Sequence, residues 1–468
     1  MKSMVRILRW QIACLATLPL IPYSLQSSIA ETKLLAAAVP TNNLQVSTAT
    51  YLGGAGEDRV TATDVAPDKT VVLGGTWKGF NPGNLTPINL LAGGDGAVIR
   101  LNTSGSQVIS VTRLGSTIND LEVSNDGKIA VCGDFGVAVL NPQANQIIWQ
   151  KQPVAGRAVS RCSIGNDGAV AALSEGFVYT YDNTGKAIAN WKVGGNQQND
   201  VAIDGASGSV FTTGFKQDDG YKCSQLQIAF LNSYNYSGQL KWQRFNWNKT
   251  QAGDLSLCAD TRGQRISMGR DGKLYFAGES SGGNTIYQRD PGNITQQLGG
   301  DRLISTDAYN TPYNTSSNWI IWYGRFTPST GTLERSQFLL ARLPAEKGNK
   351  GNTIRARAIT ADEKGQVYLS GTSACCIANR DAQRINGQPV GAYTGDTYIL
   401  VTSADFKQRL VWTPFPGTTP GSIAVRQGVA VVGMSQNANQ TQPLVTVNPL
   451  QSKPVTLPDA YFAIWLQP

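Results

Sequence analysis

The 468-residue sequence contains no histidine. This absence excludes Ser-His-Asp and Cys-His nucleophile pairs, His-Glu-x-x-His zinc sites and imidazole proton relays. Charged residues are also scarce, at 15 %, and they form no polybasic run, so nucleic acid is not an expected partner. Any catalysis would have to use carboxylates, Lys, Tyr, Arg or a bound cofactor.

The mostly apolar stretch near the start of the chain, over residues 12–25, is too short for a membrane-spanning helix. Three basic residues precede it, and Ser28-Ile29-Ala30 forms a small-x-small site after it. This is the pattern of a secretory signal peptide over residues 1–30, with a cut near residues 36–38 as the alternative. We therefore expect a protein exported to the periplasm, or to the outside or surface of a bacterial cell, with no transmembrane segment after cleavage.

Cys-x-x-Cys spacing is also missing, and without histidine the cysteines do not predict a metal site. Six cysteines remain after the expected cleavage, an even number that suits disulfides in an exported chain. The disulfide candidates are Cys132, Cys162, Cys223, Cys258, Cys375 and Cys376. The adjacent Cys375 and Cys376 would form either a vicinal disulfide or two thiols on opposite sides of a strand.

The chain does contain 50 glycines, 21 prolines and a recurring strand pattern, so it is too turn-rich for a helical protein. In this pattern a turn with Gly or Lys is followed by four or five largely apolar residues and often by Gly. The seven copies are DKTVVLGG (68–75), NDGKIAVCG (125–133), NDGAVAALS (166–174), ASGSVFTTG (206–214), RDGKLYFAG (270–278), EKGQVYLSG (363–371) and RQGVAVVGM (426–434). Gly in the Asn-Asp-Gly and Arg-Asp-Gly steps would take the positive φ that a tight hairpin needs.

Further strands complete each unit. A second alternating strand follows every copy, and a third follows in most units. First strands are expected at VTATDVA (60–66), NDLEVS (119–124), DVAIDG (200–205) and RARAITAD (355–362). Each unit would therefore be a sheet of four strands.

The two ends of the pattern complement each other. LQVSTATYLGG (44–54) would be an outer strand with no inner strands before it, whereas the last unit lacks an outer strand. We therefore predict an all-β fold, a seven-bladed β-propeller over 44–468 closed by an N-terminal strand that completes the C-terminal blade. Residues 31–43 would be a linker. A β-sandwich or two tandem β domains is the alternative.

One segment resembles a known family. YLGGAGEDRVTATDVAPDKTVVLGGT (51–76) is similar to the repeat of secreted bacterial seven-bladed β-propeller (SBBP-type) proteins, which runs Tyr-Leu-Gly-Gly, an acidic turn and a strand that ends in Gly-x-Thr. EKGQVYLSGTS (363–373) has part of the same pattern. The resemblance implies the propeller fold and an exported location. It implies no activity, because members differ in what they bind.

The connections between second and third strands are very unequal, and the long ones fall on one face of the predicted ring. They cover residues 76–94, 279–317, 372–395 and 435–458. Long loops on a rigid scaffold are where binding residues usually lie. The candidate ligand-binding residues are aromatic side chains of these loops and of one neighbouring connection: Trp77, Phe80, Phe245, Trp247, Tyr287, Tyr309, Tyr313 and Tyr393. Packing of the loops onto the blades is the alternative. Cys223 and Cys258 flank the same face and are the favoured disulfide pair.

No intact catalytic motif accompanies these loops. We therefore expect a non-catalytic binding propeller, monomeric and without a cofactor, with a protein or carbohydrate ligand on the long-loop face. A structural cell-surface protein is one alternative. A carboxylate-dependent polysaccharide hydrolase or lyase is another, because it needs only two facing carboxylates. The acidic residues near the face are Glu57, Asp58, Asp95, Glu279 and Asp396. Ca²⁺ could bind acidic and Gly-rich loops, although the sequence has no Asp-x-Asp-x-Asp-Gly loop.

Three segments place a turn before an outer-strand tryptophan, at Trp149, Trp191 and Trp242. They resemble the docking repeat of pyrroloquinoline-quinone propeller enzymes, a class that can also carry adjacent cysteines. The resemblance implies a quinone-dependent dehydrogenase as a further alternative. Only residues 182–186 keep the core of the repeat, and an extra residue displaces Trp191, so ordinary blade packing is the simpler interpretation.

Overall fold

The computed structural model describes residues 42–91, 94–312, 318–348, 350–440 and 442–467. The chain divides into Met1–Ala36 and Ala37–Pro468, and all described residues belong to the second unit. The expected signal peptide, most of the expected linker and Tyr313 lie outside the described residues. Within the ranges given above, no helix combines the length and apolar character needed to cross a membrane.

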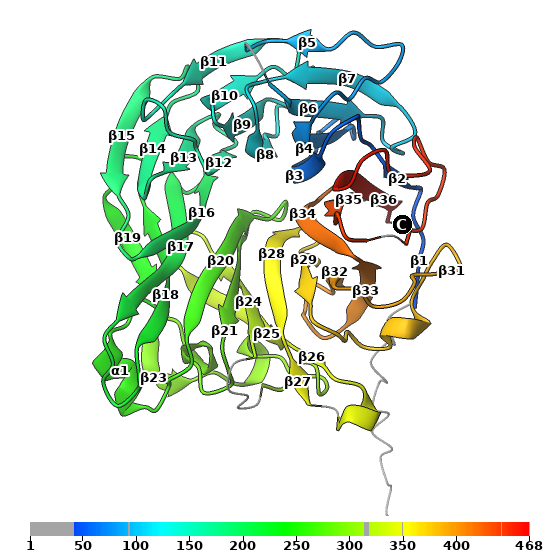
Figure 1. Cartoon of the computed structure of the whole chain (residues 1–468). Helices are drawn as coiled ribbons and strands as arrows, with labels where there is room; N and C mark the ends of the chain where they lie inside the picture. The colour runs from blue at the N-terminus through cyan, green and yellow to red at the C-terminus, as the bar shows by residue number, and fades with distance from the viewer. Residues whose placement is uncertain (1–41, 92–93, 313–317, 349, 441, 468) are drawn as a thin grey trace, which may run out of the picture. The chain divides into compact units, whose positions relative to one another are not determined.

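The second unit consists of antiparallel sheets with four main strands each, which we describe from the inside outwards (Figure 1). The innermost strands are β3 (Asp58–Val65), β8 (Ile118–Val123), β12 (Arg161–Ile164), β16 (Gln197–Asp204), β20 (Thr261–Met268), β28 (Ile354–Ala361) and β34 (Thr418–Arg426). The second strands are β4 (Val71–Trp77), β9 (Ile129–Gly133), β13 (Val170–Ser174), β17 (Ser209–Asp218), β21 (Leu274–Ser280), β29 (Val367–Ser373) and β35 (Val429–Gln436).

The outer half of each sheet follows the same order. The third strands are β6 (Gly96–Leu101), β10 (Gly136–Leu140), β14 (Phe177–Tyr181), β18 (Leu226–Tyr234), β24 (Ile320–Thr327), β32 (Asp396–Thr402) and β36 (Asp459–Leu466). The outer strands are β7 (Val108–Arg113), β11 (Ile147–Lys151), β15 (Ala187–Lys192), β19 (Leu240–Arg244), β25 (Thr332–Leu339), β33 (Arg409–Pro416) and β2 (Thr48–Tyr51). We call each sheet a blade.

Short elements occupy the ends and connections of the blades. The strands are β1 (Asn43–Leu44), β5 (Ile88–Asn89), β22 (Arg289–Asp290), β23 (Asn293–Gln297), β26 (Ala341–Arg342), β27 (Gly351–Asn352), β30 (Arg384–Ile385) and β31 (Gln388–Pro389). The helical pieces are α1 (Lys249–Asp254) and the 3₁₀ turns η1 (Ile286–Gln288), η2 (Gly300–Arg302), η3 (Ala345–Lys347) and η4 (Arg380–Ala382). Asn248 caps α1, because its side chain accepts from Gln251 N.

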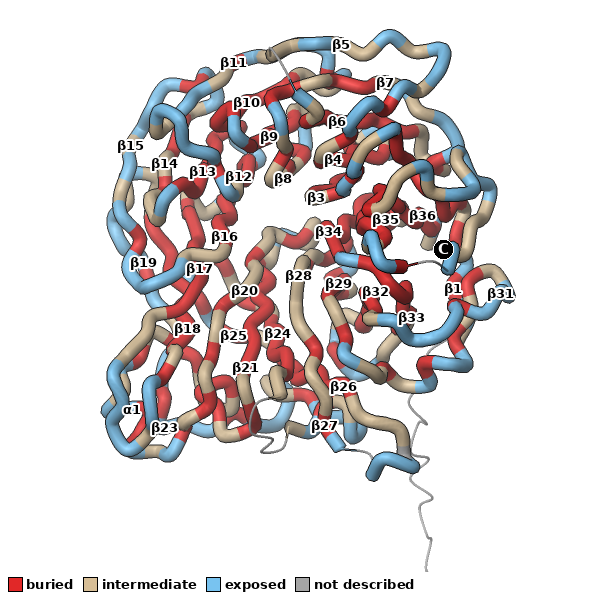
Figure 2. Tube along the Cα trace, viewed as in Figure 1, coloured by how far each residue is buried: buried red, intermediate tan, exposed pale blue. Residues whose placement is uncertain are grey.

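The second and third strands are mostly buried, and β9 and β10 are buried along their whole length, because neighbouring blades cover both faces (Figure 2). The outer β15 is exposed or half-buried throughout. In one apolar cluster, Cys132 and Val137 of one blade pack against Ile164 and Val170 of the next. The core therefore lies between blades, which explains why the second strands give the clearest apolar pattern in the sequence.

The turns between first and second strands use the glycines that the sequence indicated. Gly127, Gly168 and Gly272 follow Asn-Asp or Arg-Asp and have φ values of 85°, 80° and 75°. A residue with a side chain rarely adopts this conformation. The predicted Asn-Asp-Gly and Arg-Asp-Gly turns are confirmed.

Segments from near both ends of the described chain share one blade. β2 pairs with β36 in antiparallel register, with Thr48 opposite Ile464 and Tyr51 opposite Tyr461. Each innermost strand lies against the innermost strand of the next blade, and β34 lies against β3 (Figure 1). The inner ends of the blades therefore surround a common centre.

Because the second strand runs antiparallel to the first, the second-to-third connections leave at the N-terminal ends of the innermost strands. The longest described ones lie between β21 and β24, β29 and β32, and β35 and β36. Cys223, in the connection from β17 to β18, forms a disulfide with Cys258 just before β20, with an S–S distance of 2.02 Å. This pair, favoured from the sequence, ties a loop of one blade to the start of the next.

Candidate functional site

The structure places most of the predicted aromatic rim in the core. Trp77, Phe245 and Tyr287 have no exposed surface, and Phe80 and Trp247 are 7 % and 9 % exposed. The rings of Phe245 and Tyr287 meet edge to face, 5.1 Å apart, inside an apolar cluster. Because these segments fold back onto the blades, the five side chains stabilise them and do not present a surface to a ligand. This corrects the expectation of an aromatic binding rim at these positions.

Tyr309 and Tyr393 are the other predicted aromatic residues in the described ranges. Tyr309 is half-buried and meets the ring of Trp412 edge to face, 5.3 Å apart. Tyr393 is 40 % exposed, and the guanidinium of Arg380 lies 5.9 Å from its ring centre. Of the predicted aromatic set, the described residues leave only Tyr393 largely accessible.

The acidic residues predicted near the open face have structural contacts. Glu279 and Asp396 are buried, and salt bridges of 2.6 and 2.8 Å join them to Arg355 and Arg380. Of the others, Glu57 is exposed, Asp58 is buried and Asp95 is half-buried. In the described part of the chain, no group of three or more Cys, Asp or Glu side chains is arranged to hold a metal ion. Binding of Ca²⁺ stays an untested alternative to the expected absence of a cofactor.

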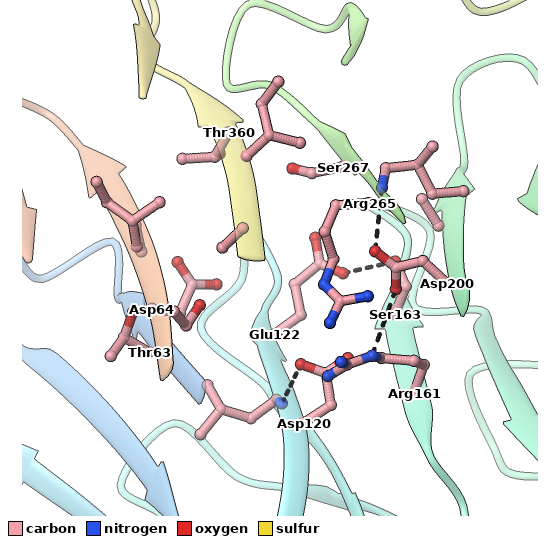
Figure 3. Close-up of a pocket in the computed structure, with 18 of the residues that line it drawn as sticks. Thr63, Asp64, Asp120, Glu122, Arg161, Ser163, Asp200, Arg265, Ser267 and Thr360 are labelled. Atoms are coloured by element: carbon pink, nitrogen blue, oxygen red, sulfur yellow. Dashed lines mark hydrogen bonds and ion pairs between the residues drawn. The ribbon is translucent and has the colours of Figure 1, made fainter. Parts of the chain in front are cut away.

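A polar cavity of about 110 Å³ lies among the innermost strands (Figure 3). Every described blade contributes its innermost strand to the lining. The charged lining residues are four acids and four bases: Asp64, Asp120, Glu122, Asp200, Arg161, Arg265, Arg270 and Arg357. Pockets for drug-sized ligands usually measure roughly 300–1,000 Å³. This cavity therefore suits a small chemical group better than an oligosaccharide.

The carboxylates of the cavity hold the free edges of the innermost strands. Asp120 accepts a hydrogen bond from Cys162 N at 3.3 Å, and Asp200 accepts one from Ile266 N at 3.0 Å. In both cases a carboxylate of one blade satisfies a backbone N–H of the next blade. The same contact recurs from Asp64 to Val123 N and from Glu122 to Ile164 N. An innermost strand has no further strand to pair with, so these bonds cover an otherwise open edge.

Equivalent positions on four consecutive innermost strands alternate in charge. The hydrogen bonds to Cys162 and Ile266 align the residues that precede them, so that Arg161 corresponds to Arg265. The aligned row reads acid, base, acid, base: Asp120, Arg161, Asp200 and Arg265 (Figure 3). Small residues such as Ala358, Gly421 and Ser422 also line the wall, and β34 contributes no charged residue to it.

Ion pairing within this row is incomplete. Arg161 Nε lies 3.8 Å from Asp200 Oδ1. Arg265 donates to backbone carbonyls, at 2.6 Å to those of Arg357 and Gln264, and makes no salt bridge with any described residue. The carboxylates of Asp200 and Asp120 act on the Arg265 guanidinium, but neither forms a salt bridge with it.

Burial and neighbouring charges move the pKa values of these groups. Burial raises the pKa of Asp120 to about 6 and that of Glu122 to about 7. Burial, and then the charge of Arg161, lowers the pKa of Arg265 to about 9. The same two causes lower the pKa of Arg357. The charged forms of Arg265 and Arg357 are thus disfavoured, and a bound anion would stabilise them.

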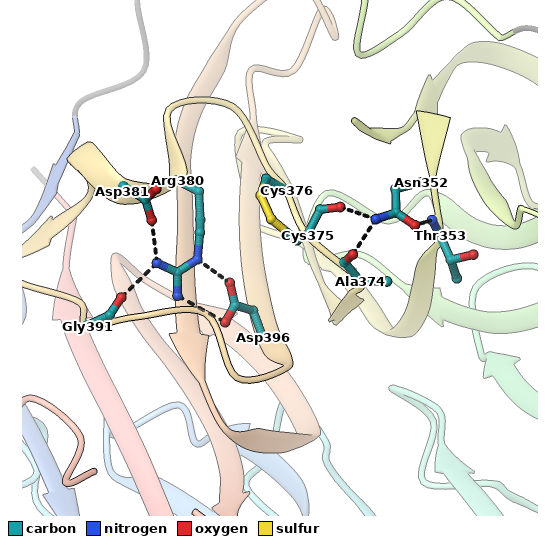
Figure 4. Close-up of a disulfide and its surroundings, with 9 residues drawn as sticks. All are labelled: Asn352, Thr353, Ala374, Cys375, Cys376, Arg380, Asp381, Gly391 and Asp396. Carbon is teal, nitrogen blue, oxygen red and sulfur yellow. Dashed lines mark hydrogen bonds and ion pairs between the residues drawn. A yellow bond between two sulfur atoms is a disulfide. The ribbon is translucent and has the colours of Figure 1, made fainter. Parts of the chain in front are cut away.

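Cys375 and Cys376 form a vicinal disulfide across a cis peptide bond in the connection after β29 (Figure 4). This decides between the two arrangements left open by the sequence. Asn352 donates hydrogen bonds to the carbonyls of Ala374 and Cys375. The backbone of Cys376 exchanges two hydrogen bonds with that of Arg342, at 2.9 and 3.0 Å.

Cys132 and Cys162 are free and buried, so the third bridge suggested by the even cysteine count is not formed. They lie on neighbouring blades in one apolar cluster, and the Cys162 thiol donates to the Asp120 carbonyl at 3.7 Å. Burial raises the pKa of both thiols, which keeps them protonated and unreactive.

The three tryptophans that precede the blade boundaries pack against turn glycines of the following blade. A Cβ at Gly185, Gly238 or Gly331 would lie 2.7 Å from the indole of Trp149, Trp191 or Trp242, respectively. Each pair therefore needs glycine for a close approach between blades. Blade packing accounts for the recurrence of these segments.

The sequence reasoning did not identify Arg161, Arg265 and Arg357 as site residues. Arg357 lies within a predicted first strand, RARAITAD (355–362), but the strands of Arg161 and Arg265 were not predicted. The sequence did contain a signal for these strands, because charged and apolar residues alternate in the segment that precedes each apolar second strand. A charged residue at the innermost position of a blade faces neither solvent nor the apolar core, and therefore needs a partner or a ligand.

No protein-family model matches the chain, and no curated protein matches it. Among solved structures, the chain is similar to U3-55K, with a TM-score of 0.52 and 10 % identity, covering 91 % of this chain and 100 % of that one. It is similarly related to the WD40 repeats of RRP9, with a TM-score of 0.51 and 9 % identity, covering 91 % and 99 %. At this identity the likeness concerns the fold, which is a β-propeller of four-stranded blades.

Proposed function

We propose that the protein is an exported, non-catalytic seven-bladed β-propeller that receives a projecting group of a partner protein in its central cavity. The polar cavity of about 110 Å³ at the meeting point of the innermost strands carries this proposal. Its carboxylates bind backbone N–H groups of neighbouring blades, which favours a binding site over an acid–base catalyst.

The pairing of strands supports a closed ring of seven blades. β2 completes the sheet of β34, β35 and β36, and β34 lies against β3. A ring closed by a strand from the other end of the chain hides the edges of its sheets and holds the blades in fixed positions. The cavity would then be a rigid site, and its entrance would lie on the long-loop face.

Two observations support export. The first 30 residues have the pattern of a signal peptide, and the folded unit contains the disulfides Cys223–Cys258 and Cys375–Cys376. A fusion of residues 1–43 to a reporter that is active only outside the cytoplasm should give active reporter. Deletion of residues 12–25 should abolish that activity. Retention of the fusion in the cytoplasm would contradict export.

Binding is tested by blocking the cavity. Ser422 lies in the wall of small residues, so Ser422→Phe would fill the space. Short peptides, sugars and small acids are screened by thermal shift against the exported protein and this variant. We expect at least one compound to raise the melting temperature of the wild type and of the control Ser224→Phe, which changes an exposed residue. The same compound should not raise the melting temperature of Ser422→Phe. A panel with no such compound would contradict a binding site in the cavity.

A carboxylate-dependent hydrolase is the second candidate, and the raised pKa values of Asp120 and Glu122 favour it, because a protonated carboxyl can act as a general acid near neutral pH. Release of reducing ends from a polysaccharide panel, lost in Glu122→Gln, would support hydrolysis. Absence of release by the folded wild type would leave binding as the function.

A further inference from the structure

We propose that the group received by the cavity is a carboxylate, bound by the guanidinium groups of Arg161, Arg265 and Arg357. This inference rests on the proposed function, because it names the chemistry that the same cavity recognises. The three arginines lie on the innermost strands of three blades, β12, β20 and β28. All three line the cavity.

Arg357 departs from a pattern that three other innermost strands follow, β3, β8 and β16. Each of several innermost strands has a β-bulge, and the short polar residue there donates to a backbone carbonyl of the next blade. Thr61 donates to Ile118 O at 2.6 Å, Asn119 to Val159 O at 2.9 Å, and Asn199 to Gly263 O at 2.7 Å. These bonds hold neighbouring blades together.

Arg357 occupies the bulge of β28, between Ala356 and Ala358. Its guanidinium lines the cavity and forms no hydrogen bond or salt bridge with any described residue. A long charged side chain therefore stands where β3, β8 and β16 have a short polar one and β20 and β34 have an uncharged Gln or Gly, and no contact among the described residues uses its charge. Residues that depart from a consistent local rule without a structural benefit are those expected to serve a ligand.

The local charge balance favours a monoanion. Arg161, Arg265 and Arg357 interact with two carboxylates, those of Asp120 and Asp200. With all five groups ionised, this end of the cavity has one positive charge in excess. One carboxylate would neutralise it, whereas a dianion would be repelled by Asp120 and Asp200. A planar guanidinium also matches a carboxylate by two parallel hydrogen bonds.

The opposite end of the innermost strands is less favourable for an anion, because the carboxylates of Asp64, Glu122 and Glu363 act on its two arginines, Arg270 and Arg426. Arg270 makes a 2.7 Å salt bridge to Asp64, which belongs to a distant blade. Arg426 donates to the carbonyls of Val123 and Ser124 at 3.0 and 3.1 Å. These contacts join blades across the centre. The excess of positive charge therefore lies at the end with Arg265 and Arg357, which is nearer the long-loop face.

The exported protein is titrated with sodium acetate and, separately, with acetamide, a neutral molecule of the same shape. The ionic strength is kept constant, and binding is measured by calorimetry and thermal shift. In parallel, a short peptide with one central Glu is compared with its Gln counterpart. We expect acetate and the Glu peptide to bind and their neutral counterparts to bind at least tenfold more weakly. Binding of the Glu peptide alone would identify a partner protein as the source of the carboxylate, whereas binding of acetate alone would identify a free small acid.

The variants separate the site from general charge. Arg357→Gln should weaken carboxylate binding at least tenfold, and Arg357→Lys should weaken it less, because it keeps the charge and loses the fork. The matched control is Arg157→Gln, an exposed arginine in a connection on the same face, which should bind as the wild type does. Each variant is first shown to melt cooperatively.

Two results would overturn the inference. Equal binding of acetate and acetamide, or wild-type affinity in folded Arg357→Gln, would show that the arginines do not recognise a carboxylate. If a neutral compound from the thermal-shift screen still depended on Ser422, the binding function would stand and only the carboxylate would be wrong. If no compound depended on Ser422, both would fall.

Discussion

Asp58 and Asp459 are buried next to each other where β3 approaches β36. Both have no exposed surface, and the Oδ1 atom of each has no hydrogen-bond partner among the described residues. A Cβ at Gly53 would overlap the carboxyl of Asp459 and crowd that of Asp58, so only glycine fits between them. Burial raises the pKa of Asp58 from 3.8 to about 6 and that of Asp459 to about 7. At least one of the two is therefore protonated in mildly acidic solution.

Because Asp459 has a raised pKa in the folded state, the stability of the protein should depend on pH. Asp459→Asn should remove that dependence. Since the pKa of Asp459 is higher in the folded state than in the unfolded one, its contribution to stability is complete below about pH 4 and is lost as the pH rises to about 7. We expect the variant to exceed the wild type in free energy of unfolding by about 1–2 kcal/mol at pH 8 and to match it closely at pH 4.5. Urea unfolding at both pH values measures this.

The control for this substitution is Asp301→Asn, which changes a side chain that is 80 % exposed. It should follow the pH profile of the wild type. An Asp459→Asn profile parallel to that of the wild type would show that the carboxyl ionises normally in the folded protein.

The cysteines lead to a second prediction at the residue scale. Because Cys132 and Cys162 are buried free thiols, iodoacetamide should modify neither in the folded exported protein. After unfolding in urea without reductant, mass spectrometry should find two modified cysteines, because the other four are in disulfides. No modified cysteine after unfolding would mean that a third bridge had formed, and four or more would mean that a disulfide is absent.

Single residues were the least predictable level. The sequence located the long connections that carry Trp77 and Tyr287, but loop length does not indicate whether a side chain folds back onto the blade. Both rings are large and mostly apolar, so their burial against the blade stabilises the fold. Tyr393 differs because its neighbourhood is polar, with Arg380 beside it.

At the scale of the element, the innermost strand has an unusual requirement. One of its edges pairs with the second strand, and the other faces the centre, where no strand follows. Carboxylates from the preceding blade supply acceptors for its N–H groups, as Asp200 does for Ile266 at 3.0 Å. The acids of the cavity are therefore part of the connection between blades.

Asp200→Ala tests the role of this carboxylate in connecting neighbouring blades. The substitution leaves Ile266 N without its acceptor and Arg161 without its salt bridge, so we expect a loss of about 2–4 kcal/mol in the free energy of unfolding. Asp200→Asn keeps an acceptor and should lose less. Hydrogen exchange should show faster exchange at Ile266 in the Ala variant, and Asp301→Ala should leave it unchanged. Unaltered exchange at Ile266 would contradict the edge-covering role.

The innermost strands also show where sequence patterns fail for whole elements. VTATDVA (60–66) and RARAITAD (355–362) overlap β3 and β28, but β12, β20 and β34 were not predicted. In β20, TRGQRISM, a bulge between Gly263 and Arg265 breaks the alternation of period two, and Arg265 lines the cavity. The second strands carry no such interruption, because blades cover both of their faces, and all of them were found.

At the scale of the molecule, the sequence was most informative, because repetition averages over the errors made at single strands. The orphan segment at 44–54 and the incomplete last unit indicated a pairing that no local pattern could show. The structure contains that pairing, β2 with β36. In the same sheet, β34 lies against β3 of the first blade, and both strands line the central cavity.

A disulfide engineered across this pairing tests the ring as a whole. Ala49 and Ala463 are directly opposite in β2 and β36, and Ala49 N donates away from β36, to Val447 O at 2.9 Å. They therefore form a non-hydrogen-bonded pair, whose Cα atoms are about 4.5 Å apart, close enough for a disulfide. In Ala49→Cys/Ala463→Cys, an oxidant should produce a cross-link that changes mobility on a non-reducing gel and raises the free energy of unfolding by about 2–4 kcal/mol.

The single variants Ala49→Cys and Ala463→Cys measure the cost of placing sulfur at buried sites, and neither should cross-link within one chain. The gain in stability should appear only in the oxidised double variant and vanish on reduction, because it arises from restricting the unfolded chain between two distant residues. A folded double variant that keeps both thiols free under oxidant would show that the two strands are not paired. The cavity formed by all of the innermost strands would then lose its structural basis, because that cavity needs the first and last blades to be neighbours.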